Sequence, residues 1–244
     1  MKYFETVGST NTEAKELVIQ GEKEGLVITA ECQTKGRGRK DRVWLSPSGG
    51  LYFSIVLEPR LGFQNAPLLG LLGACAVAQS LQNLGLKKVS LKWPNDVLIG
   101  NSKIAGILSE AVSVSDRTLG VVMGIGVNQN CPVVDMPPGL MWPTTSIIDE
   151  LGVKTSTQAL LCSIVNQIDS LLLLVDDQNS FDSILDEWRK LSSTIGRRVR
   201  IHEEAETIDG TAKDIGSDGA LIVETDEGLK HVLIGDVSHL RDEE

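Results

Sequence analysis

This chain of 244 residues is organised around the stretch Gln33-Thr34-Lys35-Gly36-Arg37-Gly38-Arg39-Lys40-Asp41-Arg42-Val43-Trp44. Its glycines permit positive φ angles and bring backbone N–H groups close to a ligand. Its guanidinium groups suit carboxylates and phosphates, and the indole of Trp44 offers a flat face to a ring. By itself the stretch fits a solvated basic loop or an RNA-binding arginine–glycine segment as well as a ligand site, so its surroundings must decide.

Regular elements are predicted on both sides of this stretch. A strand over Leu26–Gln33 leads into it, and a strand over Leu51–Leu57 follows Gly49-Gly50. Before them, a polar turn leads into a helix in which Thr10 and Glu13 fit a capping box. Further on, apolar spacing and turn residues predict a buried helix at Asn65–Leu84 with Gly85 at its C-cap, a strand at Val89–Lys92, a hairpin of Val97–Ile99 and Lys103–Glu110, a strand at Leu119–Val127, and helices at Thr144–Leu151, Ser156–Val175 and Ser180–Ser193.

The pattern changes near Ser193–Gly196. From there on, short alternating segments are separated by glycine-rich turns, which is typical of a small all-β barrel. The segments are Val199–His202, Glu206–Ile215, Ala220–Glu224 and Leu229–Ile234. We therefore divide the chain into residues 1–194 and 195–244.

Composition limits the classes of function. A net charge of -10 and a pI near 4.9 argue against a general binder of nucleic acids or membrane surfaces, so the local cations are expected to serve one anionic ligand. The apolar run Ile164–Val175 contains polar residues and is too short to span a bilayer, and the start of the chain lacks a signal peptide. The four cysteines, which lie far apart, indicate reduced thiols and a cytoplasmic protein, and histidines occur only near the C-terminus.

Polar and cationic residues collect at three strand ends: in the arginine stretch, in Trp93–Asp96 with Lys103–Gly106, and in Gly126–Asn128. A mixed sheet would bring these segments together on one face. Cations, backbone donors, carboxamides and a tryptophan would then surround one cleft, a composition that suits an adenylate with a carboxylic-acid partner.

The chain closely resembles the biotin protein ligases. The resemblance rests on Gly36–Trp44, on Lys92-Trp93-Pro94-Asn95-Asp96 and on Lys103-Ile104-Ala105-Gly106-Ile107-Leu108, with Ser9-Thr10-Asn11 and Gly126-Val127-Asn128 in support. The order and spacing of these blocks match through the whole chain, including the small C-terminal domain.

The resemblance implies an α+β fold: a class II aminoacyl-tRNA synthetase-like mixed sheet flanked by helices, followed by an SH3-like barrel. It implies a biotin–[acetyl-CoA-carboxylase] ligase that uses ATP and Mg²⁺. Biotin would be activated to biotinyl-adenylate and transferred to a lysine ε-amine of a biotin carboxyl carrier protein. A lipoate or related acyl ligase on the same scaffold is the alternative.

The resemblance also implies roles for particular residues. Lys103 and Arg39 would be the catalytic cations, and both would contact the nucleotide together with Trp44 and Asn128. Asp96 would bind Mg²⁺. The biotin site would consist of Ser9, Thr10, Asn11, Gln33, Arg37, Gly38 and Gly106. By contrast, Lys40 and Arg42 are interpreted as solvated loop charges, Trp93 as packing beneath the site, and Trp142 and Trp188 as packing residues.

Two departures from the family pattern stand out. Asp41 occupies a position where the family usually has glycine, which would stiffen the loop or alter its closure. The chain also begins at the catalytic domain, without the winged helix of the repressor-ligases, and this predicts a ligase that does not bind an operator. Homodimerisation by sheet extension at an exposed edge is a further expectation.

Overall fold

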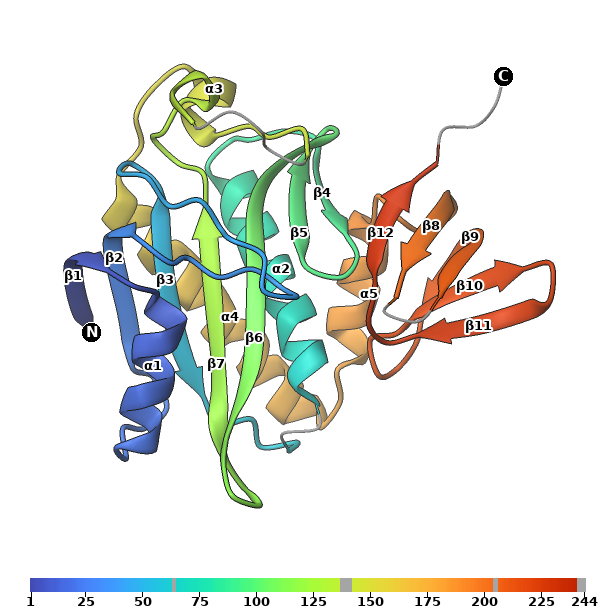
Figure 1. Cartoon of the computed structure of the whole chain (residues 1–244), viewed down its shortest axis with the longest axis horizontal. Helices are drawn as coiled ribbons and strands as arrows, with labels where there is room; N and C mark the ends of the chain where they lie inside the picture. The colour runs from blue at the N-terminus through green and yellow to red at the C-terminus, as the bar shows by residue number, and fades with distance from the viewer. Residues whose placement is uncertain (63–64, 137–141, 204–205, 241–244) are drawn as a thin grey trace.

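The computed structural model describes residues 1–62, 65–136, 142–203 and 206–240, which form a large mixed sheet and a small antiparallel sheet (Figure 1). The large sheet has the order β1-β2-β3-β7-β6-β5-β4, with β1 and β2 parallel and all other neighbours antiparallel. Its strands are β1 (Lys2–Val7), β2 (Val27–Gln33), β3 (Leu51–Leu57), β4 (Val89–Lys92), β5 (Asp96–Ile99), β6 (Ser102–Val114) and β7 (Arg117–Val127).

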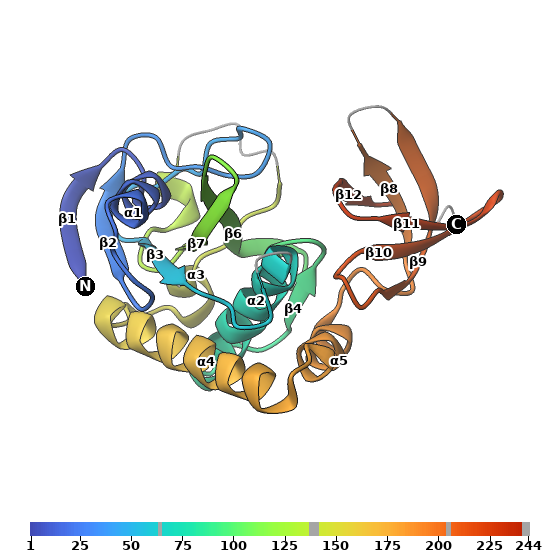
Figure 2. The same ribbon diagram turned by 90° about the horizontal axis from the view of Figure 1, so that it is seen from below.

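Helices cover both faces of the large sheet (Figure 2). On one face lie α2 (Ala66–Asn83), α4 (Thr157–Gln178) and α5 (Asp182–Leu191). Almost every side of α2 is apolar and buried, because it lies between the sheet and the other two helices. The opposite face carries α1 (Thr10–Ile19), which packs Ala14 and Val18 onto the sheet. The rest of that face is left for the arginine stretch, which crosses the strands in front of the sheet.

Within the described part of the chain, α4 is the one helix long and apolar enough to cross a membrane. Its buried residues are Leu160, Leu161, Ile164, Ile168 and Val175, a stripe at helical spacing. This stripe belongs to the main hydrophobic core, where α4 packs against α2. The helix therefore packs one stripe of residues into the core of this structure, and 28% of its apolar window is buried.

The C-terminal sheet has the order β11-β10-β9-β8-β12 and is antiparallel throughout, which confirms the predicted SH3-like architecture. Its strands are β8 (Arg198–His202), β9 (Thr207–Ile215), β10 (Leu221–Thr225), β11 (Gly228–Val232) and β12 (Asp236–His239). Its apolar face continues the main core, so the two sheets share buried surface.

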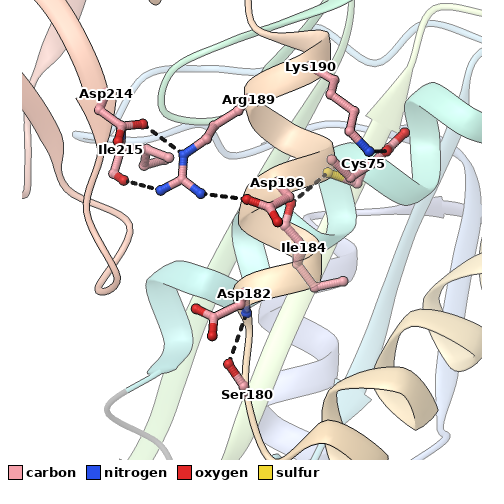
Figure 3. Close-up of polar contacts among 10 residues, drawn as sticks. Cys75, Ser180, Asp182, Ile184, Asp186, Arg189, Lys190, Asp214 and Ile215 are labelled. Carbon is pink, nitrogen blue, oxygen red and sulfur yellow. Dashed lines mark hydrogen bonds and ion pairs between the residues drawn. The ribbon is translucent and has the colours of Figure 1, made fainter.

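Polar contacts fasten this junction. The indole Nε1 of Trp93 donates to the carbonyl of Gly219 at 3.0 Å, and the backbone N–H of Trp93 donates to Thr194 Oγ1 at 3.1 Å. From α5, the guanidinium of Arg189 reaches Asp214 Oδ1 at 2.7 Å and the carbonyl of Ile215 at 2.8 Å (Figure 3). These contacts join the end of β4 and α5 to the β9 end and the β9–β10 turn of the C-terminal sheet.

Most predicted elements are confirmed, and four details are wrong. β1 and β12 were not predicted, the helix expected at Thr144–Leu151 covers only Ile147–Leu151 (α3), and the capping box is absent. The N-cap of α1 is Ser9, and Thr10 is already helical. The hydroxyl of Thr10 instead bonds to Gln33 and Ser54, in the site described below. Part of the segment between β7 and α3 lies outside the described residues, and its described part holds a short 3₁₀ turn, Val133–Asp135.

Candidate active site

A cleft of about 460 Å³ opens on the face of the large sheet that carries the arginine stretch. Its walls come from α1, from the ends of β2, β4, β5, β6 and β7, and from β12. Every residue predicted for the site from the sequence lies in this wall: Ser9, Thr10, Asn11, Gln33, Arg37, Gly38, Arg39, Trp44, Asp96, Lys103, Gly106 and Asn128. The structure therefore brings the whole predicted set together, whereas their individual roles stay predictions.

One end of the cleft is a network of uncharged polar groups. The carboxamide oxygen of Gln33 accepts from the N–H of Thr10 at 2.8 Å and from its hydroxyl at 3.2 Å. The Ser54 hydroxyl joins Thr10 Oγ1 at 2.8 Å to Asn11 Oδ1 at 2.6 Å. The network is largely buried, and such fully partnered groups keep a fixed geometry. This end can present donors and acceptors to a compact polar ring.

A carboxylate on β6 holds the side of this network. Glu110 pairs with Lys15 at 2.6 Å and with Arg37 at 3.2 Å, and it accepts from Asn11 Nδ2 at 3.1 Å. Burial raises the pKa of Glu110, but the hydrogen bonds from Lys15 and Asn11, together with the charge of Arg37, hold it below its usual value. The Glu110 carboxylate therefore stays ionised and fixes the start of the arginine stretch.

The arginine stretch itself folds as a small hairpin. Trp44 N donates to the carbonyl of Gly36 at 2.9 Å, and Gly38 N donates to the carbonyl of Arg42 at 2.7 Å. The turn has positive φ at both central residues, 50° at Lys40 and 56° at Asp41, as in a type I′ turn. Glycine is the residue that such a position favours, so this turn gives a physical reason for the glycine usual in the family, and Asp41 is a tolerated exception.

The hairpin rests on the C-terminal sheet, which the sequence did not indicate. Arg39 Nη1 donates to the carbonyl of Gly235 at 3.1 Å. Lys40 donates to the carbonyl of His202 at 3.2 Å, and Arg42 pairs with Asp236. Lys40 and Arg42 are therefore docking groups, and their interpretation as solvated charges is wrong. We call the contacts of Arg39, Lys40 and Arg42 with the C-terminal sheet the loop clamp.

Trp44 lies flat against the middle of the sheet. A Cβ built on Gly126 would come within 2.5 Å of the indole, and one built on Gly106 within 2.9 Å. Two glycines on neighbouring strands therefore make room for the ring. The indole Nε1 is buried, and among the described residues it has no hydrogen-bond partner. A buried donor without a partner is costly, so this N–H is free to serve a ligand.

Lys103 occupies the centre of the cleft. Its Nζ lies 2.5 Å from Asp96 Oδ1 and 5.1 Å from the centroid of the Trp44 ring. The nearby Asn128 uses its side-chain N–H to hold the carbonyl of Thr145 at 3.0 Å. In the described part of the chain no group of three or more His, Cys, Asp or Glu residues could hold a metal ion. Asp96 still fits Mg²⁺ carried by a nucleotide, since that ion usually takes one or two carboxylates plus phosphate oxygens and waters.

Sequence reasoning missed two residues at the far end of the cleft. Lys92 and Trp142 both line it, and Lys92 Nζ lies 4.3 Å from the centroid of the Trp142 ring. Lys92 stands in the Lys-Trp-Pro-Asn-Asp block and could have been singled out from it. The interpretation of Trp142 as a packing residue without a site role is wrong, because it lines the cleft.

Comparisons with known proteins agree with this geometry. The family described as Biotin/lipoate A/B protein ligase matches residues 3–128, and Biotin protein ligase C terminal domain matches residues 194–240. The bifunctional ligase/repressor BirA of Bacillus subtilis is 34% identical over an alignment of 242 residues that covers 96% of this chain and 72% of that protein. The biotin–[acetyl-CoA-carboxylase] ligase of Mycobacterium tuberculosis is 32% identical over 96% of this chain and 86% of its own length.

A solved structure is similar along its whole length. The biotin protein ligase of Aquifex aeolicus in complex with biotin and ATP superimposes with a TM-score of 0.84 at 30% identity, and the match covers 98% of each chain.

Proposed function

This chain belongs to the Biotin/lipoate A/B protein ligase family, and on that basis we propose that it joins biotin to protein. It activates biotin with ATP to biotinyl-adenylate and then transfers the biotinyl group to the ε-amine of a lysine on a biotin carboxyl carrier protein. The single observation that carries this function is the cleft, which has a neutral polar pocket at one end and cations in its middle.

The first step joins two anions. A carboxylate oxygen of biotin attacks the α-phosphorus of ATP, the bond to the bridging oxygen breaks, and pyrophosphate leaves. We assign the ureido ring of biotin to Ser9, Thr10 and Gln33. The donors and acceptors of these residues match the polar ureido group, whereas the ring of lipoate is apolar. Asn11, Arg37, Gly38 and Gly106 complete this biotin site. The reacting carboxylate would then lie over the middle of the sheet.

Cations in the middle of the cleft supply the electrostatics. We assign Lys103 and Arg39 to the charge that develops on the α-phosphoryl group, where each donor is worth about 3 kcal/mol of transition-state stabilisation. Arg39 already lies in a partly desolvated place, since burial lowers its pKa while Asp236 opposes that shift. Trp44 and Asn128 are assigned to the nucleotide. When bound, Mg²⁺ on Asp96 would neutralise phosphate charge.

The second step needs a dry site until the acceptor arrives. Biotinyl-adenylate is a mixed anhydride that water hydrolyses, and a loop that covers it excludes water. We assign this role to the hairpin Gly36–Trp44, which lies over the cleft and is held by the loop clamp. The acceptor amine then attacks the acyl carbon, an amide forms and AMP leaves.

Three further points belong to this proposal. Residues 1–194 would form the catalytic domain and residues 195–244 the SH3-like domain. The free cysteines suit a cytoplasmic protein, and the net charge of -10 suits one that does not act on nucleic acid. The open edge of β1 would allow a homodimer by sheet extension.

Exchange of labelled pyrophosphate into ATP tests the function. We expect exchange that depends on biotin and magnesium, and biotin transfer to an acceptor domain. Lys103→Met should lower the exchange rate by at least about a hundredfold, because one donor to the developing charge is lost. Folded protein without exchange, or exchange with lipoate in place of biotin, would contradict the proposal.

A further inference from the structure

Lys92 is a cation of the cleft without an acidic partner. Among the described residues, no hydrogen bond or ion pair joins its side chain to another group, and its ammonium lies on the Trp142 ring. The other cations differ: Lys103 pairs with Asp96, and the cations of the arginine stretch are held as described above. Five cationic side chains line the cleft against two carboxylates, so Lys92 carries much of its excess charge.

The surroundings of Lys92 make an anionic ligand favourable. Burial lowers its pKa; Asp96 and Asp236 oppose this shift, whereas Lys103 and Arg42 add to it. A half-buried ammonium without a counter-ion costs free energy that an arriving anion would recover. In a cleft, such a group is typical of a functional site.

The order of the strands indicates which anion this is. Gln33 ends β2, Lys103 lies on β6 and Lys92 ends β4, so the three follow one another across the sheet. Neighbouring strands lie about 4.8 Å apart, so Lys92 is about two strand spacings beyond Lys103. Within the described residues, Lys92 is cross-strand partner to Asp96, which joins it to the centre of the cleft.

Phosphoryl transfer places the attacking and leaving oxygens roughly in line on opposite sides of the phosphorus. With biotin over β2, β3 and β7 and the α-phosphorus beside Lys103, the leaving group must depart toward β5 and β4. Resting on the proposed function, we propose that Lys92 binds the β- and γ-phosphates of ATP and holds the departing pyrophosphate. The electron pair of the broken bond goes to the pyrophosphate oxygen, which the ammonium stabilises.

This role distinguishes Lys92, which would contact the β- and γ-phosphates, from Lys103, which would contact the α-phosphoryl group. Biotinyl-adenylate has no β- or γ-phosphate, so Lys92 should matter for ATP and pyrophosphate but not for the intermediate. Lys92→Met removes the charge and keeps a flexible chain of similar length beside Trp142. Lys92→Arg keeps the charge. Lys87→Met is the matched control, because Lys87 is exposed just before β4 and far from the cleft.

Calorimetric titration with pyrophosphate, with ATP and with biotinyl-5′-adenylate tests the assignment without turnover. For Lys92→Met we expect the Kd for pyrophosphate and the KM for ATP to rise about tenfold to a hundredfold, the loss of one charge-assisted hydrogen bond. The Kd for biotinyl-5′-adenylate, and its rate of transfer to the acceptor domain, should stay within about twofold. Lys92→Arg should recover most of the loss, and Lys87→Met should behave like the wild type.

Two results would overturn the assignment: unchanged affinity for pyrophosphate in Lys92→Met, or an equal loss of affinity for biotinyl-5′-adenylate. Thermal unfolding of each variant checks that the fold is intact, and if Lys92→Met unfolds, Lys92→Gln takes its place. Failure of the proposed function looks different, since the wild type itself would then show no biotin-dependent exchange.

Discussion

Single glycines decide whether the cleft has its shape. Gly126 and Gly106 leave room for the Trp44 indole, and at Gly124 a Cβ would lie 1.9 Å from Asn11 Oδ1. None of these glycines has a positive φ angle, so each is required for space and not for backbone freedom. The family resemblance singled out Gly106 as part of the biotin site, and in the structure the side chain next to Gly106 is Trp44.

The substitution Gly126→Ala tests this account. Its methyl group would displace Trp44, so we expect the Kd for biotinyl-5′-adenylate to rise at least about tenfold and the protein to lose about 1–3 kcal/mol of stability, as overpacked sites do. Gly120→Ala on the same strand is the control, because its Cβ would meet Leu57 O at 3.4 Å, an ordinary contact. Titration calorimetry and urea unfolding measure the two effects. Similar behaviour of both variants would show that Trp44 has room to move.

Residue identity alone could predict the centre of the site but not its far wall. Gln33, Lys103 and Asn128 stand in blocks whose residue types suit the chemistry, and the sheet brings them together. Asp236 gave no local signal, because it reaches the cleft only through the packing of the second sheet, and Trp142 stands outside the recognised blocks.

Among the elements, the hairpin and β12 depend on each other. The loop clamp joins cations of the hairpin to carbonyls and one carboxylate of the C-terminal sheet. The hairpin is short and glycine-rich, and it has little apolar contact of its own apart from Trp44. Its position over the cleft therefore depends on Asp236, which pairs with both Arg42 and Lys40.

We expect Asp236→Ala to loosen the hairpin. Partly exposed ion pairs are worth up to about 1 kcal/mol each, so trypsin should cleave after Arg39, Lys40 or Arg42 about fivefold faster, and more biotinyl-adenylate should escape into solution. Asp226→Ala removes the same charge from an exposed turn of the same sheet and should change neither rate. If loop cleavage in Asp236→Ala matches that in the control, the clamp does not hold the hairpin.

Elements with a strong apolar pattern were predictable, and weakly patterned edges were not. β3 is buried along its whole length and α2 along most of it, and both stand out in the sequence. β1 and β12 are short edge strands whose pairing depends on distant partners. The capping-box prediction at Thr10 is wrong because the Thr10 hydroxyl bonds to Gln33 and Ser54 instead of capping the helix.

Across the whole molecule, the junction between the sheets contains a half-buried histidine. His239 Nε2 lies 3.2 Å from Thr194 Oγ1, which also accepts the N–H of Trp93. Burial and, to a lesser extent, the nearby charges of Lys92 and Arg197 together lower the pKa of His239 to about 4. The neutral imidazole is therefore the form that the folded junction accepts.

This histidine should make stability depend on pH. In the unfolded chain its pKa is about 6.5, so between pH 4 and 6.5 the unfolded state binds more protons than the folded state. The contribution of the neutral ring is fully present above that window, and it is lost as the pH falls through it. His239→Gln cannot take up this proton, so its free energy of unfolding in urea should fall less steeply with acid. If the free energy of unfolding falls equally with acid in the wild type and in His239→Gln, His239 is not the source of the pH dependence.

The contact of the Trp93 indole with the carbonyl of Gly219 has a consequence for chimeric enzymes. A C-terminal sheet transplanted from a relative must offer a carbonyl at the same point, and a residue there that leaves Leu68 and Leu71 undisturbed. A graft that preserves every recognised motif yet shifts this turn would leave the buried indole N–H without an acceptor. The loss would cost about 1–3 kcal/mol of folding free energy. The two halves are therefore not interchangeable modules, and successful swaps should be those that exchange the partners of Trp93 together with it.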